Sequence, residues 1–313
     1  MLEYLKGVID LEIKNWTYED YPSYVDSTIP TLKTTGDEIG VHYWENIEYL
    51  NDDGISLSLQ ILEPFTRNEP EKEYPCVIFV QGSAWMKQEK YKNLPQLNQL
   101  AKRGYVCALV EYRDSSQASF PAQIIDTRNA VRYLKKHAQD YHILSEQMIL
   151  MGDSSGGHTV LFAGIMHDDE SENNAFKGIS AEVKGIISLY GASSVMDEDS
   201  YPSTLNHHMP DSPEGLMAGG IDLKEHKDIC EKISFERNVT KETDIVPVLL
   251  IHGSKDRTVN PKQSVKVYKQ LKACQKDVSF YLLDGADHGG AEFWTNQVID
   301  IEEEFIQRSI KLG

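Results

Sequence analysis

The stretch Met148–His158, MILMGDSSGGH, decides how this chain is expected to fold. Met148–Met151 is a short, wholly apolar run, which predicts a buried strand. His158–His167 has a helical pattern, so a glycine-rich turn lies between a strand and a helix. Such a strand–turn–helix unit is the context in which a G-x-S-x-G motif can expose a reactive serine.

The spacing within the turn selects one serine. Gly152 and Gly156 lie two residues on either side of Ser154, where the close approach of strand and helix requires small side chains. Centring the motif on Ser155 would place Asp153 in one of these positions. We therefore predict Ser154 as the nucleophile, with Ser155 as the weaker candidate, and an ordinary glycine-rich turn as the structural alternative.

Strands and helices alternate along most of the chain on both sides of this turn. Apolar runs without polar alternation are typical of parallel strands that are covered on both faces. The expected strands are an early hairpin, Val41–Leu50 with Ile55–Leu62, and then Cys76–Val80, Tyr105–Val110, Met148–Met151, Ile186–Leu189, Val246–Ile251 and Val278–Leu283. The expected helices are Lys92–Arg103, Ala122–Gln139, His158–His167, Lys262–Lys276 and Ala291–Ile310. This order predicts an α/β fold with a mostly parallel central sheet and helices on both faces.

Two segments interrupt the alternation. Residues 1–40 have weak periodicity and are predicted to form an N-terminal arm of unknown role. Residues 192–244, rich in proline, glycine and charge, separate two strands by more than one crossover helix needs. We predict a single domain over residues 41–313, with 192–244 as a small irregular insertion over the end of the sheet.

Composition excludes several classes of protein. The 313 residues carry 49 acidic and 31 basic side chains, a net charge of −18, which disfavours nucleic acid as a partner. No apolar run is long enough for a membrane helix, and the N-terminus has no apolar signal core, so we predict a cytoplasmic protein without a membrane partner. The cysteines are not spaced for zinc and are expected to be buried and reduced: Cys76, Cys107, Cys230 and Cys274.

A nucleophilic serine needs a base, and the base needs an acid that orients it. Asp256 follows the predicted strand Val246–Ile251, and His288 lies in a glycine-flanked loop after the next strand. The carboxyl ends of parallel strands meet at one edge of the sheet, so these groups can reach Ser154. Asp284 is an alternative acid, whereas Asp287 is adjacent to His288 and cannot orient it in the usual way.

The third requirement is a set of N–H groups for the negative oxygen of the transition state. One is expected from Ser155, the residue after the nucleophile. The others are expected in residues 81–85, QGSAW, the loop after the strand Cys76–Val80, although an ordinary tight turn is the alternative there.

These motifs together resemble the α/β-hydrolase esterases. The resemblance rests on QGSAW at 81–85, FPAQ at 120–123 with Asp126, AVRYL at 130–134 and GDSSGGH at 152–158. Residues 212–220, SPEGLMAGG, add a similarity to the lipase/esterase branch that includes bifunctional acetyl-xylan/feruloyl esterases, which is related to the hormone-sensitive-lipase-like enzymes. The resemblance covers about residues 55–310.

The resemblance implies an α/β-hydrolase fold, a triad of Ser154, Asp256 and His288, and oxyanion donors at Ser83, Ala84 and Ser155. Three positions depart from the usual family pattern: Gln81 replaces a histidine, Ser83 a glycine and Ser155 an alanine. A backbone donor survives loss of a glycine only if the turn needs no positive φ there.

These features predict a serine carboxylester hydrolase that needs no metal or cofactor and acts on small, short-acyl, acetyl-type esters. Trp85, Phe293 and Trp294 lie near the predicted catalytic residues and are expected to line the substrate site, although Phe293 and Trp294 could instead anchor the last helix. The alternatives are a prolyl-peptidase-like serine peptidase and a non-catalytic binding protein of the same fold. The predicted partner is a small-molecule ester, and a homo-oligomer is left open.

Overall fold

The computed structural model describes residues 16–52, 54–165, 176–196 and 202–312. Contacts divide the chain into two units, Met1–Thr35 and Gly36–Gly313. Residues 16–35 of the first unit form turns and bends without helix or strand. Residues 1–15 of the predicted N-terminal arm lie outside the described residues, and the arm and the domain boundary at residue 41 stay predictions.

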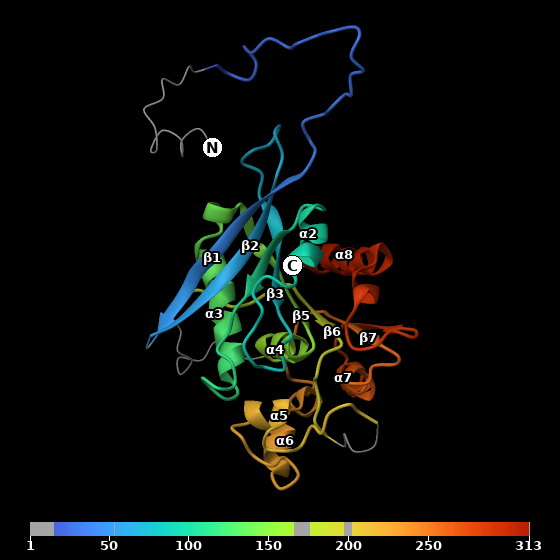
Figure 1. The fold of residues 1–313 in the computed structure, drawn as a ribbon. Coiled ribbons are helices and arrows are strands. Elements are labelled where there is room, and N and C mark those ends of the chain that lie inside the picture. Colours follow the sequence, from blue (N-terminus) through green and yellow to red (C-terminus); the bar gives the residue numbers. More distant parts are fainter. Residues whose placement is uncertain (1–15, 53, 166–175, 197–201, 313) are drawn as a thin grey trace. The chain divides into compact units, whose positions relative to one another are not determined.

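The second unit is built on an eight-stranded sheet in the order β1-β2-β4-β3-β5-β6-β7-β8 (Figure 1). The strands are β1 (Gly40–Asp52), β2 (Ile55–Phe65), β3 (Tyr74–Val80), β4 (Val106–Val110), β5 (Ile143–Asp153), β6 (Gly185–Leu189), β7 (Val248–Gly253) and β8 (Val278–Leu283). The β1–β2 hairpin is antiparallel, as is the β2–β4 pair, and every other neighbouring pair is parallel. The predicted hairpin and mostly parallel sheet are therefore confirmed.

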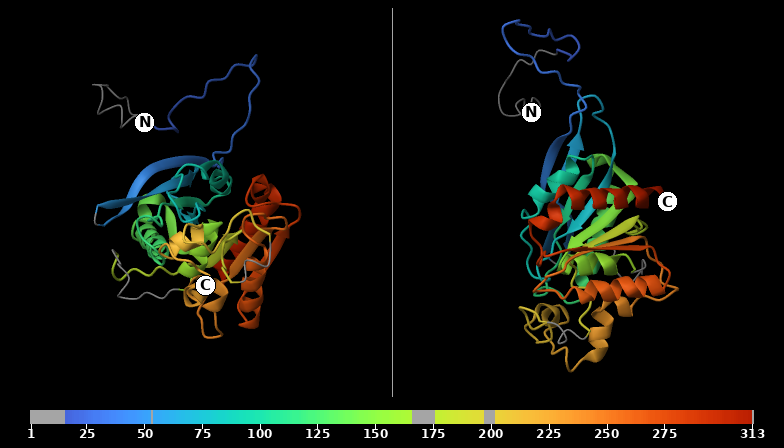
Figure 2. Two further views of the ribbon diagram at one scale, coloured as in Figure 1. Left: turned by 60° about the horizontal axis from the view of Figure 1, so that its bottom comes forward. Right: turned by 90° about the vertical axis from the view of Figure 1, so that its right-hand side faces the viewer.

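Helices cover both faces of this sheet (Figures 1 and 2). The main helices are α2 (Leu94–Ala101), α3 (Ala122–Lys136), α4 (Ser155–Ala163), α7 (Lys262–Ala273) and α8 (Asn296–Lys311). One core holds apolar side chains of α3, α4 and α7 against the sheet, and a second core on the opposite face holds those of α2 and α8. Strands between two cores must be apolar on both faces, which explains their unbroken hydrophobic runs.

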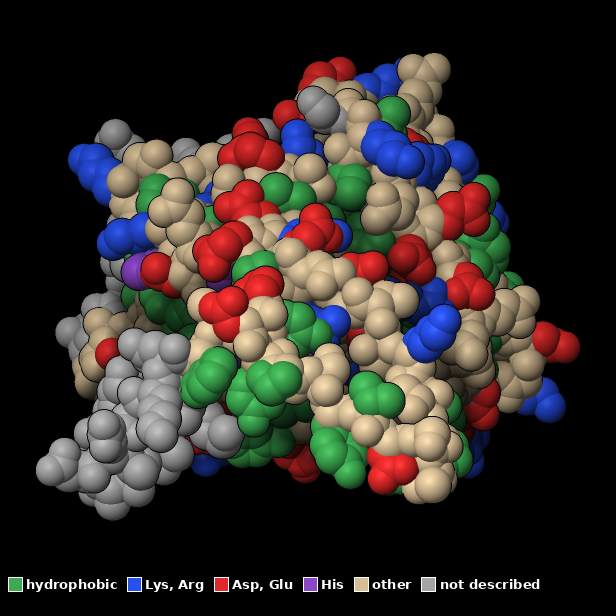
Figure 3. All heavy atoms as spheres, turned by 90° about the horizontal axis from the view of Figure 1, so that it is seen from above, with side chains coloured by type: hydrophobic (Ala, Val, Ile, Leu, Met, Phe, Trp, Pro, Cys, Tyr) green, Lys and Arg blue, Asp and Glu red, His purple; other side chains and the backbone are tan. Residues whose placement is uncertain are grey.

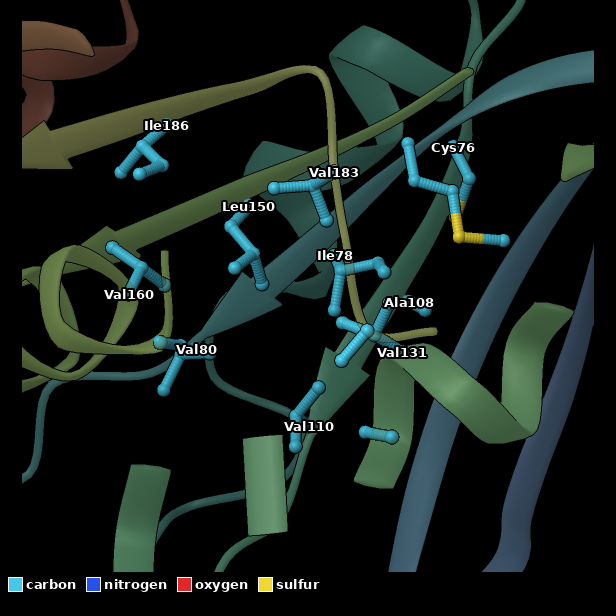
Figure 4. Close-up of a cluster of buried hydrophobic side chains, with 14 of the residues drawn as sticks. Cys76, Ile78, Val80, Ala108, Val110, Val131, Leu150, Val160, Val183 and Ile186 are labelled. Atoms are coloured by element: carbon cyan, nitrogen blue, oxygen red, sulfur yellow. The ribbon is translucent and has the colours of Figure 1, made fainter. Parts of the chain in front are cut away.

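Successive residues of a central strand serve different cores. In β3, Ile78 lies in the first core and Phe79 in the second, and neither is exposed to solvent. Figure 4 shows the first core, where Ile78 lies near Ala108 of β4 and Leu150 of β5. All four cysteines are buried and unpaired, as predicted.

The C-terminal helix differs from its prediction at the start. A short 3-10 helix, η4 (Ala291–Trp294), precedes α8, and Thr295 separates the two. The Thr295 hydroxyl accepts a hydrogen bond from the Val298 N–H and so caps α8. The predicted continuous helix Ala291–Ile310 is therefore two elements, because an N-cap residue has a non-helical backbone.

The strand order reverses at β3. Strand β4 lies on one side of β3, and the chain then returns to place β5 on its other side. In an open α/β sheet, the loops beyond the carboxyl ends of the strands at such a reversal leave a crevice for a ligand. The predicted oxyanion loop 81–85 follows β3 and Ser154 follows β5, so both lie at this position.

The insertion lies at the same end of the sheet. Its described helices are α5 (Pro213–Met217), α6 (Lys227–Ile233) and the 3-10 helix η3 (Phe235–Arg237), and residues 197–201 lie outside the described residues. A third apolar cluster joins Met217 and Ile233 to Trp85, Val195 and Val259, which follow β3, β6 and β7. The described part of the predicted insertion therefore packs against the loops that follow these strands, and its bounds stay a prediction (Figure 2).

Candidate active site

The turn at Ser154 has the strained geometry that the motif predicts. Ser154 has φ +51° and ψ −122°, a backbone conformation that non-glycine residues rarely adopt. A Cβ on Gly152 would lie 2.4 Å from the carbonyl oxygen of Gly156, and one on Gly156 would lie 1.9 Å from that of Val80. Both positions therefore exclude a side chain, and the contact at Gly156 also joins the turn to β3.

The three residues of the predicted triad are in hydrogen-bond contact. The Nε2 atom of His288 lies 2.9 Å from the Oγ of Ser154, and its Nδ1 lies 2.8 Å from Oδ2 of Asp256. Because a carboxylate only accepts, Nδ1 carries the proton and Nε2 can accept the serine hydroxyl.

The alternative residues have other partners. Asp284 accepts a hydrogen bond from the Ser254 hydroxyl, and Asp287 forms an ion pair with Arg257. The hydroxyl of Ser155 accepts a hydrogen bond from the loop after β3 rather than facing His288. The geometry thus favours Ser154 as the nucleophile and Asp256 as the acid.

Four donors surround the buried carboxylate of Asp256. Its Oδ1 accepts hydrogen bonds from the backbone N–H groups of Thr258 and Val259, at 2.9 and 2.8 Å. Its Oδ2 faces His288 and also Nε2 of His252, at 3.0 Å. Burial raises the pKa of the Asp256 carboxyl, but hydrogen bonds from His252 and His288 outweigh it and hold the pKa below its usual value. Asp256 is therefore an anion at neutral pH.

His252 was not identified from the sequence. It is the fifth residue of β7, is fully buried, and lies four residues before Asp256. A histidine inside an otherwise apolar strand, just before the loop that carries the acid, is the signal that could have found it.

Two free backbone donors lie near Ser154, one in the loop after β3 and one at the start of α4. The N–H groups of Ala84 and Ser155 have no hydrogen-bond partner within the described ranges. The Ser83 N–H instead donates to the Oγ of Ser155 at 3.0 Å, so the expectation that it serves as an oxyanion donor is not met in this geometry. Positive φ occurs at Ala84 and Trp85 but not at Ser83, so serine replaces the usual glycine there without backbone strain.

The departure at Gln81 has a structural explanation. Its side-chain amide donates to the carbonyl oxygen of Glu89 and to Oδ1 of Asn93, and its Oε1 accepts from the Glu89 N–H. The buried glutamine thereby ties the start of the oxyanion loop to the segment that leads into α2.

Asp153 and Tyr190 link the loop to the histidine. The Gly82 N–H donates to Oδ1 of Asp153 at 2.6 Å, and the Tyr190 hydroxyl donates to Oδ2 at 2.8 Å. Burial raises the pKa of the Asp153 carboxyl. The Tyr190 ring meets the His288 ring edge-on, with centroids 4.9 Å apart. Neither residue was predicted to act at the site. Asp153 is adjacent to Ser154 in sequence, but its partner Tyr190 follows β6, which only the fold brings beside it.

A cleft of about 780 Å³ opens above Ser154 and His288. Polar side chains line its wall on the α2 side, among them Lys92, Gln96 and Gln99, and Trp294 lines another part. The cleft therefore offers hydrogen-bond partners and two large aromatic side chains, Tyr190 and Trp294, next to Ser154.

The three aromatic residues predicted to line the substrate site have different positions. Trp294 does line the cleft. Phe293 is fully buried in the second core against Tyr190, with ring centroids 4.4 Å apart, which corrects its prediction in favour of the anchoring alternative. Trp85 is 1% exposed and packs under the insertion beside His158, so its prediction is also corrected. Burying a large apolar side chain is favourable relative to leaving it exposed to water, which explains the positions of Phe293 and Trp85.

Three further findings concern the described residues as a whole. It contains no group of three or more His, Cys, Asp or Glu side chains placed to hold a metal ion. None of its helices combines the length and hydropathy needed to cross a membrane. Acidic and basic side chains are interspersed on the face shown in Figure 3.

The chain is similar to known proteins over most of its length. The BD-FAE family model matches residues 60–271. Esterase LipC of Mycobacterium tuberculosis is 26% identical over 234 residues, which are 74% of this chain and 57% of LipC. Esterase LipQ of the same organism is 22% identical over 70% of this chain and 51% of its own length. The chain thus spans about half the length of these curated relatives.

Solved structures confirm the predicted α/β-hydrolase fold. A truncated carbohydrate esterase from gut microbiota superposes with a TM-score of 0.75 at 24% identity, over 88% of this chain and 99% of that one. A thermophilic esterase from Thermogutta terrifontis superposes with a TM-score of 0.66 at 20% identity, over 87% and 94% of the two chains.

Proposed function

Because the chain belongs to the BD-FAE family, we propose that it is a serine carboxylester hydrolase whose triad is Ser154, His288 and Asp256. The hydrogen-bonded series from the Ser154 hydroxyl through His288 to Asp256 carries the proposal. It lies at the strained turn between β5 and α4, beside two free N–H groups and inside a cleft.

The geometry supports an acyl-enzyme mechanism. The Ser154 oxygen attacks the ester carbonyl while its proton passes to Nε2 of His288, and Asp256 stabilises the imidazolium. The N–H groups of Ala84 and Ser155 donate to the negative oxygen of the tetrahedral intermediate. The intermediate then collapses, the bond to the alcohol oxygen breaks, and His288 returns its proton to the departing alcohol.

A second half-reaction releases the acid. Water enters the cleft and transfers a proton to His288 as it attacks the acyl carbon of the Ser154 ester. Collapse of this second intermediate frees the carboxylic acid and restores the serine hydroxyl. In each half-reaction His288 takes up the proton and returns it, and Asp256 stabilises the imidazolium in between.

The cleft favours small polar esters over lipids. Lys92, Gln96 and Gln99 can hydrogen-bond a hydroxylated alcohol, and Trp294 offers an apolar face for a sugar ring or a short acyl group. Relatives of the fold include a protein described as a carbohydrate esterase. We therefore propose acetyl-type esters of small alcohols as substrates, in the cytoplasm, where the four unpaired cysteines would remain reduced.

The direct test combines activity with labelling of the serine. Wild-type protein should hydrolyse p-nitrophenyl acetate and form a covalent adduct with a fluorophosphonate on Ser154. Ser154→Ala should lose the adduct and nearly all turnover while keeping the wild-type melting temperature, because one hydroxyl in an open cleft contributes little packing.

Three other outcomes would contradict the proposal. Cleavage of an aminoacyl anilide in preference to the acetate would indicate a peptidase. Absence of any adduct on folded protein would indicate a binding protein. Labelling of Ser155, or retained activity in Ser154→Ala, would overturn the choice of nucleophile.

A further inference from the structure

Two histidines share one oxygen of the acid. Oδ2 of Asp256 lies 2.8 Å from Nδ1 of His288 and 3.0 Å from Nε2 of His252. His288 lines the cleft, whereas His252 is fully buried behind the carboxylate. A buried polar side chain in this position costs free energy unless its hydrogen bonds are made, and one of the hydrogen bonds of His252 is made to the acid of the proposed triad.

The surroundings of His252 identify the nitrogen that carries its proton. Nε2 faces two groups that can only accept, the Asp256 carboxylate and the Val259 carbonyl oxygen at 3.1 Å. Nδ1 lies 2.7 Å from the hydroxyl of Ser264, which can donate. The Nε2–H tautomer of the neutral ring satisfies all three contacts, so His252 is a donor to Asp256.

We propose that His252 is a positioning residue for the acid of the triad, an inference that rests on the proposed function. Its Nε2–H holds the carboxylate in the rotamer that presents Oδ2 to His288. The same hydrogen bond partly neutralises the negative charge on Oδ2, so the carboxylate stabilises the imidazolium form of His288 less strongly.

A purely structural role is the competing explanation. The Ser264 hydroxyl lies on α7, so His252 also joins β7 to that helix. The two roles use different nitrogens of the ring: Nδ1 makes the link to α7 and Nε2 makes the link to Asp256. Substitutions that keep one link and lose the other can therefore separate them.

The contacts of the other ionisable groups near His288 must not change in such a test. They belong to four further segments and are Asp153 before the nucleophile, Tyr190 after β6, Lys92 before α2, and the Asp287–Arg257 ion pair beside His288. None of them contacts His252 among the described residues, so a substitution at His252 acts on His288 through Asp256.

The test uses His252→Gln and His252→Asn as a matched pair. The longer glutamine amide can place an N–H where Nε2 lies, whereas the shorter asparagine amide reaches only the position of Nδ1. The rate of p-nitrophenyl acetate hydrolysis is measured from pH 5 to 9 for both variants and the wild type. His158→Asn is the control, since His158 is also a buried histidine, and its one hydrogen-bond partner among the described residues is the Ile233 carbonyl oxygen, through Nε2.

We expect His252→Asn to lower kcat by about 10- to 100-fold with KM little changed, the range for loss of a hydrogen bond to a charged group. The rising limb of its pH–rate profile should move to higher pH by about half a unit or more, because the unshared charge of Asp256 favours the imidazolium form of His288. His252→Gln should recover most of kcat and the wild-type profile. The His158 control should keep the wild-type profile.

Equal kcat and equal pH profiles in the two His252 variants, or failure of both to fold, would overturn the proposal and assign His252 to fold stability alone. Asp256→Asn and Ser154→Ala are measured in parallel. If these two remain active, the proposed function itself is wrong. If they are inactive while the glutamine and asparagine variants match, only the inference about His252 fails.

Discussion

A buried histidine next to the active site should make the stability of this protein depend on pH. His158 lies on α4 with 1% of its surface exposed, between the rings of Trp85, Phe120 and Phe162. Its Nε2 donates to the carbonyl oxygen of Ile233, and its Nδ1 has no partner among the described residues. Burial lowers the pKa of His158 to about 4, against a small opposing effect of the bond to Ile233.

The direction of the effect follows from where the proton binds first. In the unfolded chain His158 has the ordinary histidine pKa of 6.5, so the unfolded state takes up a proton before the folded state does. The contribution to stability is therefore complete above pH 6.5 and is lost as the pH falls towards about 4. Each pKa unit corresponds to about 1.4 kcal/mol, so the total loss is about 3 kcal/mol, of which about 2 kcal/mol is lost by pH 5.

The substitution His158→Phe removes this titration while keeping an aromatic ring in the site. Urea unfolding at pH 7 and pH 5 gives the free energy of unfolding of both proteins. Phenylalanine leaves the Ile233 carbonyl without its donor, which lowers stability equally at both pH values. Between pH 7 and pH 5 the free energy of unfolding of the wild type should therefore fall by about 2 kcal/mol more than that of the variant, so that the difference between the two proteins shrinks. A difference that stays the same at both values would refute the reasoning.

Three other predictions concern the glycine turn, the two tryptophans and the effect of a chelator. Gly156→Ala should destabilise the fold by more than about 4 kcal/mol, because its Cβ would meet the Val80 carbonyl at 1.9 Å, and thermal melting or insoluble expression would show it. Trp294→Ala should change the preference among acetyl, butyryl and octanoyl esters, whereas Trp85→Ala should lower the melting temperature with an unchanged preference, since only Trp294 lines the cleft; the reverse result would contradict these positions. A chelator should leave the rate unchanged, and a loss restored by added zinc would contradict the proposed mechanism.

The sequence alone determined the architecture of this protein and predicted the three residues proposed as its triad. Unbroken apolar runs alternate with helical patterns because strands covered on both faces have no polar side to show. The elbow around Ser154 could be predicted because a strand that turns directly into a helix leaves no room for a side chain at Gly152, whose Cβ would meet the Gly156 backbone. The contact of Gly156 with Val80 adds a constraint that comes from β3. Asp256 and His288 could be predicted because parallel strands bring their carboxyl ends to one edge.

Only the tertiary structure decided which neighbours these residues have. The bond between Ser83 and Ser155 and the contact between Tyr190 and Asp153 join residues 72 and 37 positions apart. His252 lies only four residues before Asp256, and their contact depends on how the loop after β7 folds back. Phe293 and Trp294 are adjacent in sequence, yet one is buried in the core and the other lines the cleft. Side-chain direction at the end of an element depends on the packing of the surfaces around it, and one residue of offset is enough to reverse it.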